Sequence, residues 1–101
     1  MNGSYFVDTN VLIKLLNGDE RIATFLSGNH IYISAITEIE LLSKSSLTKD
    51  EIKKIKSLIE DCIVIDNFSD EIKSFAAKLR REKVVKKTPD AIIAAQQNII
   101  V

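Results

Sequence analysis

Three acidic residues of this sequence, Asp8, Glu40 and Asp90, have the types and surroundings that could support catalysis. Each lies beside an apolar run, at a point where the chain is expected to enter a core. Carboxylate oxygens are the ligands that Mg²⁺ prefers, and the ion usually takes one or two carboxylates and keeps several waters. A cation held in this way activates water and neutralises the charge of a phosphodiester. The three acids are therefore candidate metal ligands if the fold brings them together.

Two of these acids also have a simple structural interpretation. Asp8 begins the triplet Asp8-Thr9-Asn10, and all three residue types are good caps for the helix expected to follow. Asp90 follows Pro89 at the start of the last expected helix, where the helix dipole stabilises a negative charge whatever else the residue does. Taken singly, neither position distinguishes a helix cap from a metal ligand.

Glu40 has a stronger structural alternative. The stretch Thr37-Glu38-Ile39-Glu40 has the pattern of a capping box, in which the Glu40 side chain would bond back to the Thr37 backbone. The neighbours of Glu40 are apolar, which indicates surroundings less solvated than a surface cap needs. The helix expected here has an apolar set that we expect to face inward, namely Ile36, Ile39, Leu41 and Leu42.

The elements that must position these acids follow from the hydrophobic pattern. Short apolar strands are expected at 4–8, 30–34 and 62–66, and helical periodicity separates them. This alternation predicts an α/β fold with a short parallel sheet. Sites in such sheets form beyond the carboxyl ends of the strands. Asp8, Glu40 and Asp90 are therefore expected to converge on one edge.

Composition limits the protein's class. The chain has 101 residues, enough for a single domain over 1–101, and 14 basic residues balance 14 acidic ones. Cys62 is the only cysteine, so it cannot form an internal disulfide and suits a reducing compartment. The start lacks the pattern of a secretory signal, and no run approaches the roughly 18 apolar residues of a membrane span. These features predict a cytoplasmic protein without a membrane association.

Three stretches, FVDTNVLIKLL, ISAITEIELL and TPDAIIAA, occur in this order. Together they resemble the three leading signatures of the PIN domain, and most closely those of the small toxins of VapBC-type toxin–antitoxin pairs. The resemblance implies a PIN-like three-layer α/β/α fold with a Mg²⁺- or Mn²⁺-dependent ribonuclease site. It assigns the metal-binding and catalytic acids to Asp8, Glu40 and Asp90, and supporting roles to Asn10 and Thr9.

The resemblance also implies a reaction and partners. The activity of such toxins is hydrolysis of an RNA phosphodiester by metal-activated water, and a cognate antitoxin protein blocks the acidic pocket. The toxin itself is commonly a homodimer. Two alternatives stay open: a catalytically impaired PIN remnant that binds an antitoxin or itself, and a purely structural α/β domain.

The end of the sequence departs from the family pattern. Family members continue past the DAIIAA helix into a further strand and a Thr-x-Asp motif that carries a fourth acid. This chain reads AAQQNIIV and ends, so we expect a C-terminally incomplete PIN domain whose last strand is missing or shortened. NIIV could either close the last helix or form a short strand.

A basic segment precedes Asp90. Residues 78–87, KLRREKVVKK, include the cations proposed to contact RNA phosphates: Arg80, Arg81, Lys83, Lys86 and Lys87. The alternative is a solvated helix end, at which cations complement the helix dipole. The two interpretations are compatible.

Overall fold

The computed structural model describes residues 3–100, and its centre is a three-stranded parallel sheet. The strands are β1 (Ser4–Phe6), β2 (His30–Ser34) and β3 (Ile63–Ile65), in the spatial order β1-β2-β3. Tyr5 lies opposite Ile31, and Tyr32 lies opposite Ile63. The predicted parallel α/β sheet is confirmed, although β1 and β3 are shorter than the expected 4–8 and 62–66.

Six helices surround the sheet within the described residues. They are α1 (Thr9–Leu16), α2 (Glu20–Leu26), α3 (Ala35–Leu42), α4 (Lys49–Glu60), α5 (Asp70–Arg81) and α6 (Thr88–Ile100). NIIV therefore continues the last helix as far as Ile100, and Val101 lies outside the described residues. None of the helices in residues 3–100 has the length and apolarity that a membrane span requires.

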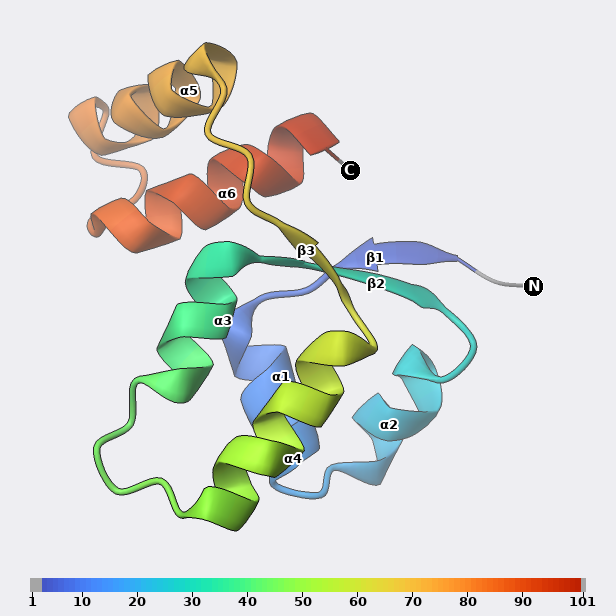
Figure 1. Ribbon diagram of the computed structural model, residues 1–101. Helices are drawn as coiled ribbons and strands as arrows, with labels where there is room; N and C mark the ends of the chain where they lie inside the picture. The colour runs from blue at the N-terminus through green and yellow to red at the C-terminus, as the bar shows by residue number, and fades with distance from the viewer. Residues whose placement is uncertain (1–2, 101) are drawn as a thin grey trace.

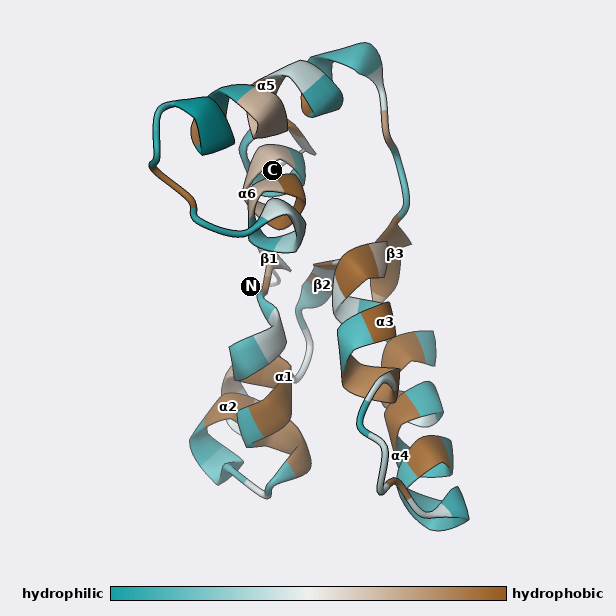
Figure 2. Ribbon diagram, turned by 90° about the vertical axis from the view of Figure 1, so that its left-hand side faces the viewer, coloured by the Kyte–Doolittle hydropathy of each residue, from teal (hydrophilic) through white to brown (hydrophobic). Residues whose placement is uncertain are grey.

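The helices lie on both faces of the sheet. Figure 1 shows α1 to α4 on one side and the α5–α6 pair on the other. The view turned by 90° shows the same layers, with α6 next to the strands and α5 outermost (Figure 2). The arrangement is the expected α/β/α layering.

The main core lies between the sheet and α1, α3 and α4. Side chains alternate along a strand, so the face that carries Val7 and Ile33 points towards these helices. Leu12 and Ile33 are completely buried there, with Leu41 and Ile55 from α3 and α4. Each such side chain contributes about 1.5–3 kcal/mol on burial. This core anchors α1, which Asp8 caps, and α3, which carries Glu40 in its last turn.

A second, smaller core joins α5 to α6. Ile72 and Ala76 of α5 pack with Ala91 and Ala95 of α6, all nearly or fully buried. The small alanines allow the two helices to approach closely. Gln96 is buried beside them, and its amide donates to the carbonyl oxygens that follow β3. These contacts fasten α6, the helix that carries Asp90.

Local side-chain chemistry fixes several helix ends. Thr48 and Glu51 form a capping box at the start of α4, and Ser69 caps α5. Gly18 follows α1 with a φ of 89°, a left-handed conformation that glycine adopts without strain. The expectation for Ile39 is wrong, because this side chain is 61% exposed, whereas the buried residues of α3 are Thr37 and Leu41.

Candidate metal and RNA-cleavage site

The three predicted acids line one hollow at the carboxyl edge of the sheet. Its volume is about 580 Å³. Asp8 comes from the end of β1, Glu40 from α3 and Asp90 from the first turn of α6. The complete lining is Asp8, Thr9, Asn10, Ile13, Glu40, Asp90, Ile93, Ala94 and Gln97. Every acid and supporting residue expected from the sequence therefore faces this hollow.

Asp8 is both a helix cap and a lining residue of the hollow. Its Oδ1 accepts a hydrogen bond from the backbone N–H of Val11 at 3.1 Å, which caps α1. A carboxylate has about four lone-pair sites, so this single bond leaves Oδ2 available to the hollow. The two interpretations that the sequence left open are compatible at this residue.

The capping-box interpretation of Glu40 is wrong. Helix α3 begins earlier than this pattern requires, with Ser34 as its N-cap accepting from Ile36 N at 3.0 Å. Thr37 thus lies inside the helix, and the Glu40 carboxylate turns to another element. Its Oε1 lies 2.7 Å from the Thr9 hydroxyl of α1. Glu40 is also exposed, although its apolar neighbours indicated less solvated surroundings.

Asp90 reaches the hollow from a helix face that the sequence analysis did not assign. Asp90, Ile93, Ala94 and Gln97 all line the hollow, and their spacing of three, four and seven residues places them on one side of α6. Gln97 was therefore missed as a candidate, although the helical spacing from Asp90 indicates it. Its amide adds a neutral oxygen and an N–H donor to the lining, beside those of Asn10.

The donor chemistry of the hollow fits a hard divalent cation. Among the described residues, the ion pairs are Arg21–Asp19, Lys73–Asp70 and Lys78–Glu82, so no basic side chain neutralises the three acids. In residues 3–100 no three acidic, histidine or cysteine side chains gather closely enough to enclose an ion. The arrangement fits an ion held by one or two carboxylates that keeps water ligands, the usual Mg²⁺ coordination.

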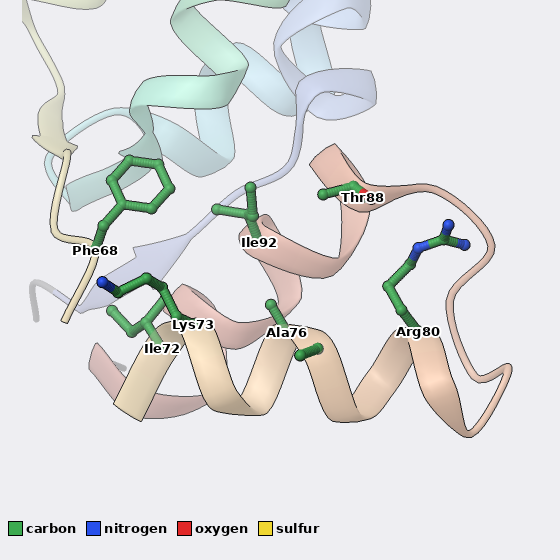
Figure 3. A pocket seen from close by; sticks show the side chains of 8 residues that line it. Phe68, Ile72, Lys73, Ala76, Arg80, Thr88 and Ile92 are labelled. Atoms are coloured by element: carbon green, nitrogen blue, oxygen red, sulfur yellow. The ribbon is translucent and has the colours of Figure 1, made fainter. Parts of the chain in front are cut away.

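The basic segment lies on α5 and on the connection to α6. All five predicted cations are exposed, and Lys87 lies three residues before Asp90. Arg80 has an internal role as well, because its guanidinium donates to the backbone carbonyl of Lys86. Figure 3 shows Arg80 at one end of a separate hollow of about 430 Å³ between α5 and α6, which Ile72 and Ile92 also line. This second hollow contains none of the three acids.

Residues 5–97 match the PIN domain family, and the chain belongs to that family. The fold and the acidic hollow described above agree with this membership. No curated protein sequence matches the chain.

Solved structures of toxin–antitoxin and VapBC proteins are also similar to this chain. A toxin–antitoxin complex from Klebsiella pneumoniae matches with a TM-score of 0.72 and 27% identity, over 99% of this chain and 80% of that chain. VapBC2 from Rickettsia felis, bound to a DNA fragment from its promoter, has a TM-score of 0.65 and 21% identity over 94% and 79%. VapBC-1 from nontypeable Haemophilus influenzae has a TM-score of 0.64 and 24% identity over 94% and 78%. The last two show the shared fold.

Proposed function

We propose that this PIN-domain protein is a Mg²⁺- or Mn²⁺-dependent endoribonuclease, the toxin of a VapBC-type pair. One observation carries the proposal. Three carboxylates from separate elements, Asp8, Glu40 and Asp90, line one hollow, and no basic side chain among the described residues pairs with them. Uncompensated negative charge at one place attracts a divalent cation.

The side chains that line the hollow would have different roles in cation binding. Asp8, Glu40 and Asp90 face the hollow from three elements; one or two of them would hold the cation directly, and the rest would act through its bound waters. Asn10 would support Asp8, and the Thr9 hydroxyl orients Glu40. The bound cation would supply an activated water and neutralise charge on the phosphodiester. The open shape of the hollow suits a polymer that enters and leaves.

RNA would be guided by the basic segment next to Asp90. Arg81 is exposed at the end of α5, and Lys83, Lys86 and Lys87 are exposed on the α5–α6 connection; all four can contact phosphates. Arg80 would act mainly by holding this connection through the Lys86 carbonyl. The cations and the acids would therefore bind different parts of one strand, with the scissile phosphate at the acidic hollow.

An antitoxin protein is the proposed partner, since the Klebsiella relative was solved in a toxin–antitoxin complex. A groove of about 430 Å³ with an apolar floor and charged side chains around it, among them Lys44 and Glu51, adjoins the acidic hollow, and Ile13 and Glu40 line both. Ile13 is 42% exposed there. Apolar side chains of an antitoxin could fill this groove while a basic one covers Glu40. We place the pair in the cytoplasm, where Cys62 stays reduced.

The surface of the chain supports binding to partners. Its accessible area is 6948 Å², about 1,200 Å² above the roughly 5,700 Å² of a typical folded monomer of this mass. A standard protein interface covers about 800 Å² on each partner. The excess is large enough for an antitoxin interface and part of the proposed homodimer interface.

A second function has its own supporting observation. The described carboxylates form no cluster tight enough to enclose an ion. A PIN domain with such a site could bind an antitoxin, or itself, without cleaving RNA. Cleavage assays with Mn²⁺ distinguish the two functions.

The decisive experiment incubates the purified chain with a mixed-sequence RNA and Mn²⁺, beside the variant Asp8→Asn. The asparagine keeps an oxygen for the α1 cap and removes the charge. We expect cleavage by the wild type, loss of cleavage on chelation, and no cleavage by Asp8→Asn. Intact RNA with folded wild type at high enzyme concentration would instead favour the binding module.

Antitoxin binding has a matched pair of variants. Ile13→Glu places a charge in the groove beside the acidic hollow, and Val84→Glu places one at a more exposed apolar residue of the α5–α6 connection. The probe is the product of any small open reading frame that adjoins the gene of this chain, coexpressed with each variant. We expect Ile13→Glu to lose the complex and Val84→Glu to retain it. Equal retention by both variants contradicts the proposed groove.

A further inference from the structure

The hydroxyl of Thr37 is buried beneath the acidic hollow, in the middle of α3. Thr37 has no exposed surface, and its Oγ1 lies 3.1 Å from Oγ1 of Thr9 on α1. The same Thr9 oxygen lies 2.7 Å from Glu40 Oε1. Thr37 and Glu40 are three residues apart on α3 and so share a face of that helix. The Thr9 hydroxyl is thus held between two side chains of one helix.

The direction of these hydrogen bonds follows from the number of protons. A threonine hydroxyl has one proton to donate and two lone pairs that accept. The Glu40 carboxylate only accepts, and its contact with Thr9 is short, as expected of a charge-assisted bond. The Thr9 proton therefore goes to Glu40. Thr37 must then be the donor to Thr9, since no second Thr9 proton exists.

We infer that Thr37 is a positioning residue of the cation site, acting on Glu40 through the Thr9 hydroxyl. The inference rests on the proposed function in so far as Glu40 binds a cation. Glu40 is exposed, and a free glutamate side chain samples several rotamers. The chain Thr37–Thr9–Glu40 selects one of them. Because Thr37 is buried among packed residues, it fixes the Thr9 oxygen more firmly than solvent could.

Partners behind a metal ligand typically change metal affinity by tenfold or more when removed. The test compares Thr37→Val, which keeps the shape and removes the hydroxyl, with Thr37→Ser, which keeps the hydroxyl. Mn²⁺ binding is titrated by electron paramagnetic resonance, which reports the free ion. We expect Thr37→Val to bind Mn²⁺ about tenfold more weakly and Thr37→Ser to bind like the wild type. Unchanged affinity in Thr37→Val, or equal losses in both variants, would overturn the inference.

A double-mutant cycle tests the route through Thr9. If Thr37 acts only through that hydroxyl, the variant Thr9→Val/Thr37→Val binds Mn²⁺ no more weakly than Thr9→Val alone. Losses that add across the two positions would overturn the assignment, because they would mean that Thr37 acts independently. Should Thr37→Val not fold, the same comparison is made between Thr37→Ala and Thr37→Ser.

A measurement without metal separates this inference from the proposed function. In the metal-free protein, nuclear Overhauser contacts between the Glu40 γ-methylene and the Thr9 methyl group report the selected rotamer. We expect them in the wild type and in Thr37→Ser, and expect them to weaken in Thr37→Val. Their persistence in Thr37→Val overturns the positioning role whether or not Mn²⁺ binds. A wild type that shows the contacts but binds no Mn²⁺ refutes the metal site alone.

Discussion

The side-chain amide of Gln96 donates to the backbone carbonyl of Asn67 at 3.1 Å, across 29 residues of sequence. A longer contact, 3.4 Å, reaches the carbonyl of Ile65 at the end of β3. The amide orientation is determined by chemistry, because carbonyl oxygens accept only from the N–H₂ end. Gln96 therefore joins α6, and with it Asp90, to the edge of the sheet. Its Oε1 is buried without a hydrogen-bond partner in the described residues.

Gln96→Glu should destabilise the protein strongly at neutral pH. The new carboxylate would be buried against two carbonyl oxygens, and an uncompensated buried charge costs about 3–5 kcal/mol. The protonated acid can donate one hydrogen bond, so the loss of unfolding free energy should be small below the unfolded pKa of about 4.3. This loss should grow as the pH rises above that value, because the carboxyl group ionises in the unfolded chain but is kept neutral by burial in the folded protein. Urea denaturation at pH 4 and pH 7 measures this. Asn98→Asp, exposed on the same helix and outside the acidic hollow, is the control, and equal losses in the two variants would contradict the role of Gln96 in joining α6 to the sheet.

Substitutions at Asp8 should separate its cap from its proposed metal role. Asp8→Ala removes the acceptor for Val11 N–H and should lower the free energy of unfolding by about 1 kcal/mol. Asp8→Asn keeps an oxygen there and should change stability by less than about 0.5 kcal/mol. Both should lose metal-dependent RNA cleavage. Denaturation of the two metal-free variants measures their stability, and cleavage assays measure their activity. Residual cleavage by Asp8→Asn would rule out the carboxylate as an essential ligand.

The basic connection should govern the salt dependence of RNA binding. Replacing Lys86 and Lys87 by alanine in the Asp8→Asn background should reduce the slope of log K against log salt by about 0.7 for each lost phosphate contact. Fluorescence anisotropy with a single-stranded RNA measures the slope. The control replaces Lys53 and Lys56, exposed on α4 away from the acids. If the slope is unchanged when Lys86 and Lys87 are replaced, or is reduced equally in both variants, the proposed RNA contact is contradicted.

Glu51 predicts a specific pH dependence. Hydrogen bonds with the backbone and hydroxyl of Thr48 hold the pKa of the Glu51 carboxyl below its ordinary value. A lowered folded pKa means that the contribution to stability is present above the unfolded value of about 4.3 and is lost as the pH falls through the folded pKa. The stability advantage of wild type over Glu51→Gln should therefore disappear in acid. Denaturation of both proteins between pH 2 and 7 measures this advantage, and an advantage that persists at pH 2 would contradict the role of the Glu51 carboxylate.

Lys83→Gly should stabilise the protein. Lys83 has a φ of 59°, in the left-handed region, where it ends α5 with Val84 N–H bonded to the Leu79 carbonyl. Helix α1 ends in the same way at Gly18, which has the residue that this conformation favours. Removing the strain should raise the free energy of unfolding by roughly 0.5–1 kcal/mol. Lys83→Ala removes the same charge but keeps the strain, so a gain in both variants would point to charge instead.

Local chemistry made much of this protein predictable. The positions of the strands and helices, the Thr48 capping box and the Gly18 helix end depend on residues close in sequence, whose propensities tertiary contacts only reinforce. The ordered signatures around Asp8, Glu40 and Asp90 indicated the PIN family that residues 5–97 match. The direction in which α3 presents its side chains was less predictable. Ile39 and Leu41 are both apolar, and only packing against the sheet made Leu41 the buried one.

The partners of the acids were decided by contacts between distant segments. The Thr37–Glu40 spacing allowed a capping box within one helix, but an alternative donor for Glu40 was present 31 residues away in Thr9. Because Ser34 caps α3, Thr37 lies inside the helix and cannot form a capping box with Glu40. The core that packs α1 against α3 brings the Thr9 hydroxyl to Glu40 instead. Sequence spacing reports which groups share a helix face. Which hydrogen bonds form depends on what the rest of the fold brings within 3 Å, and that required the tertiary structure.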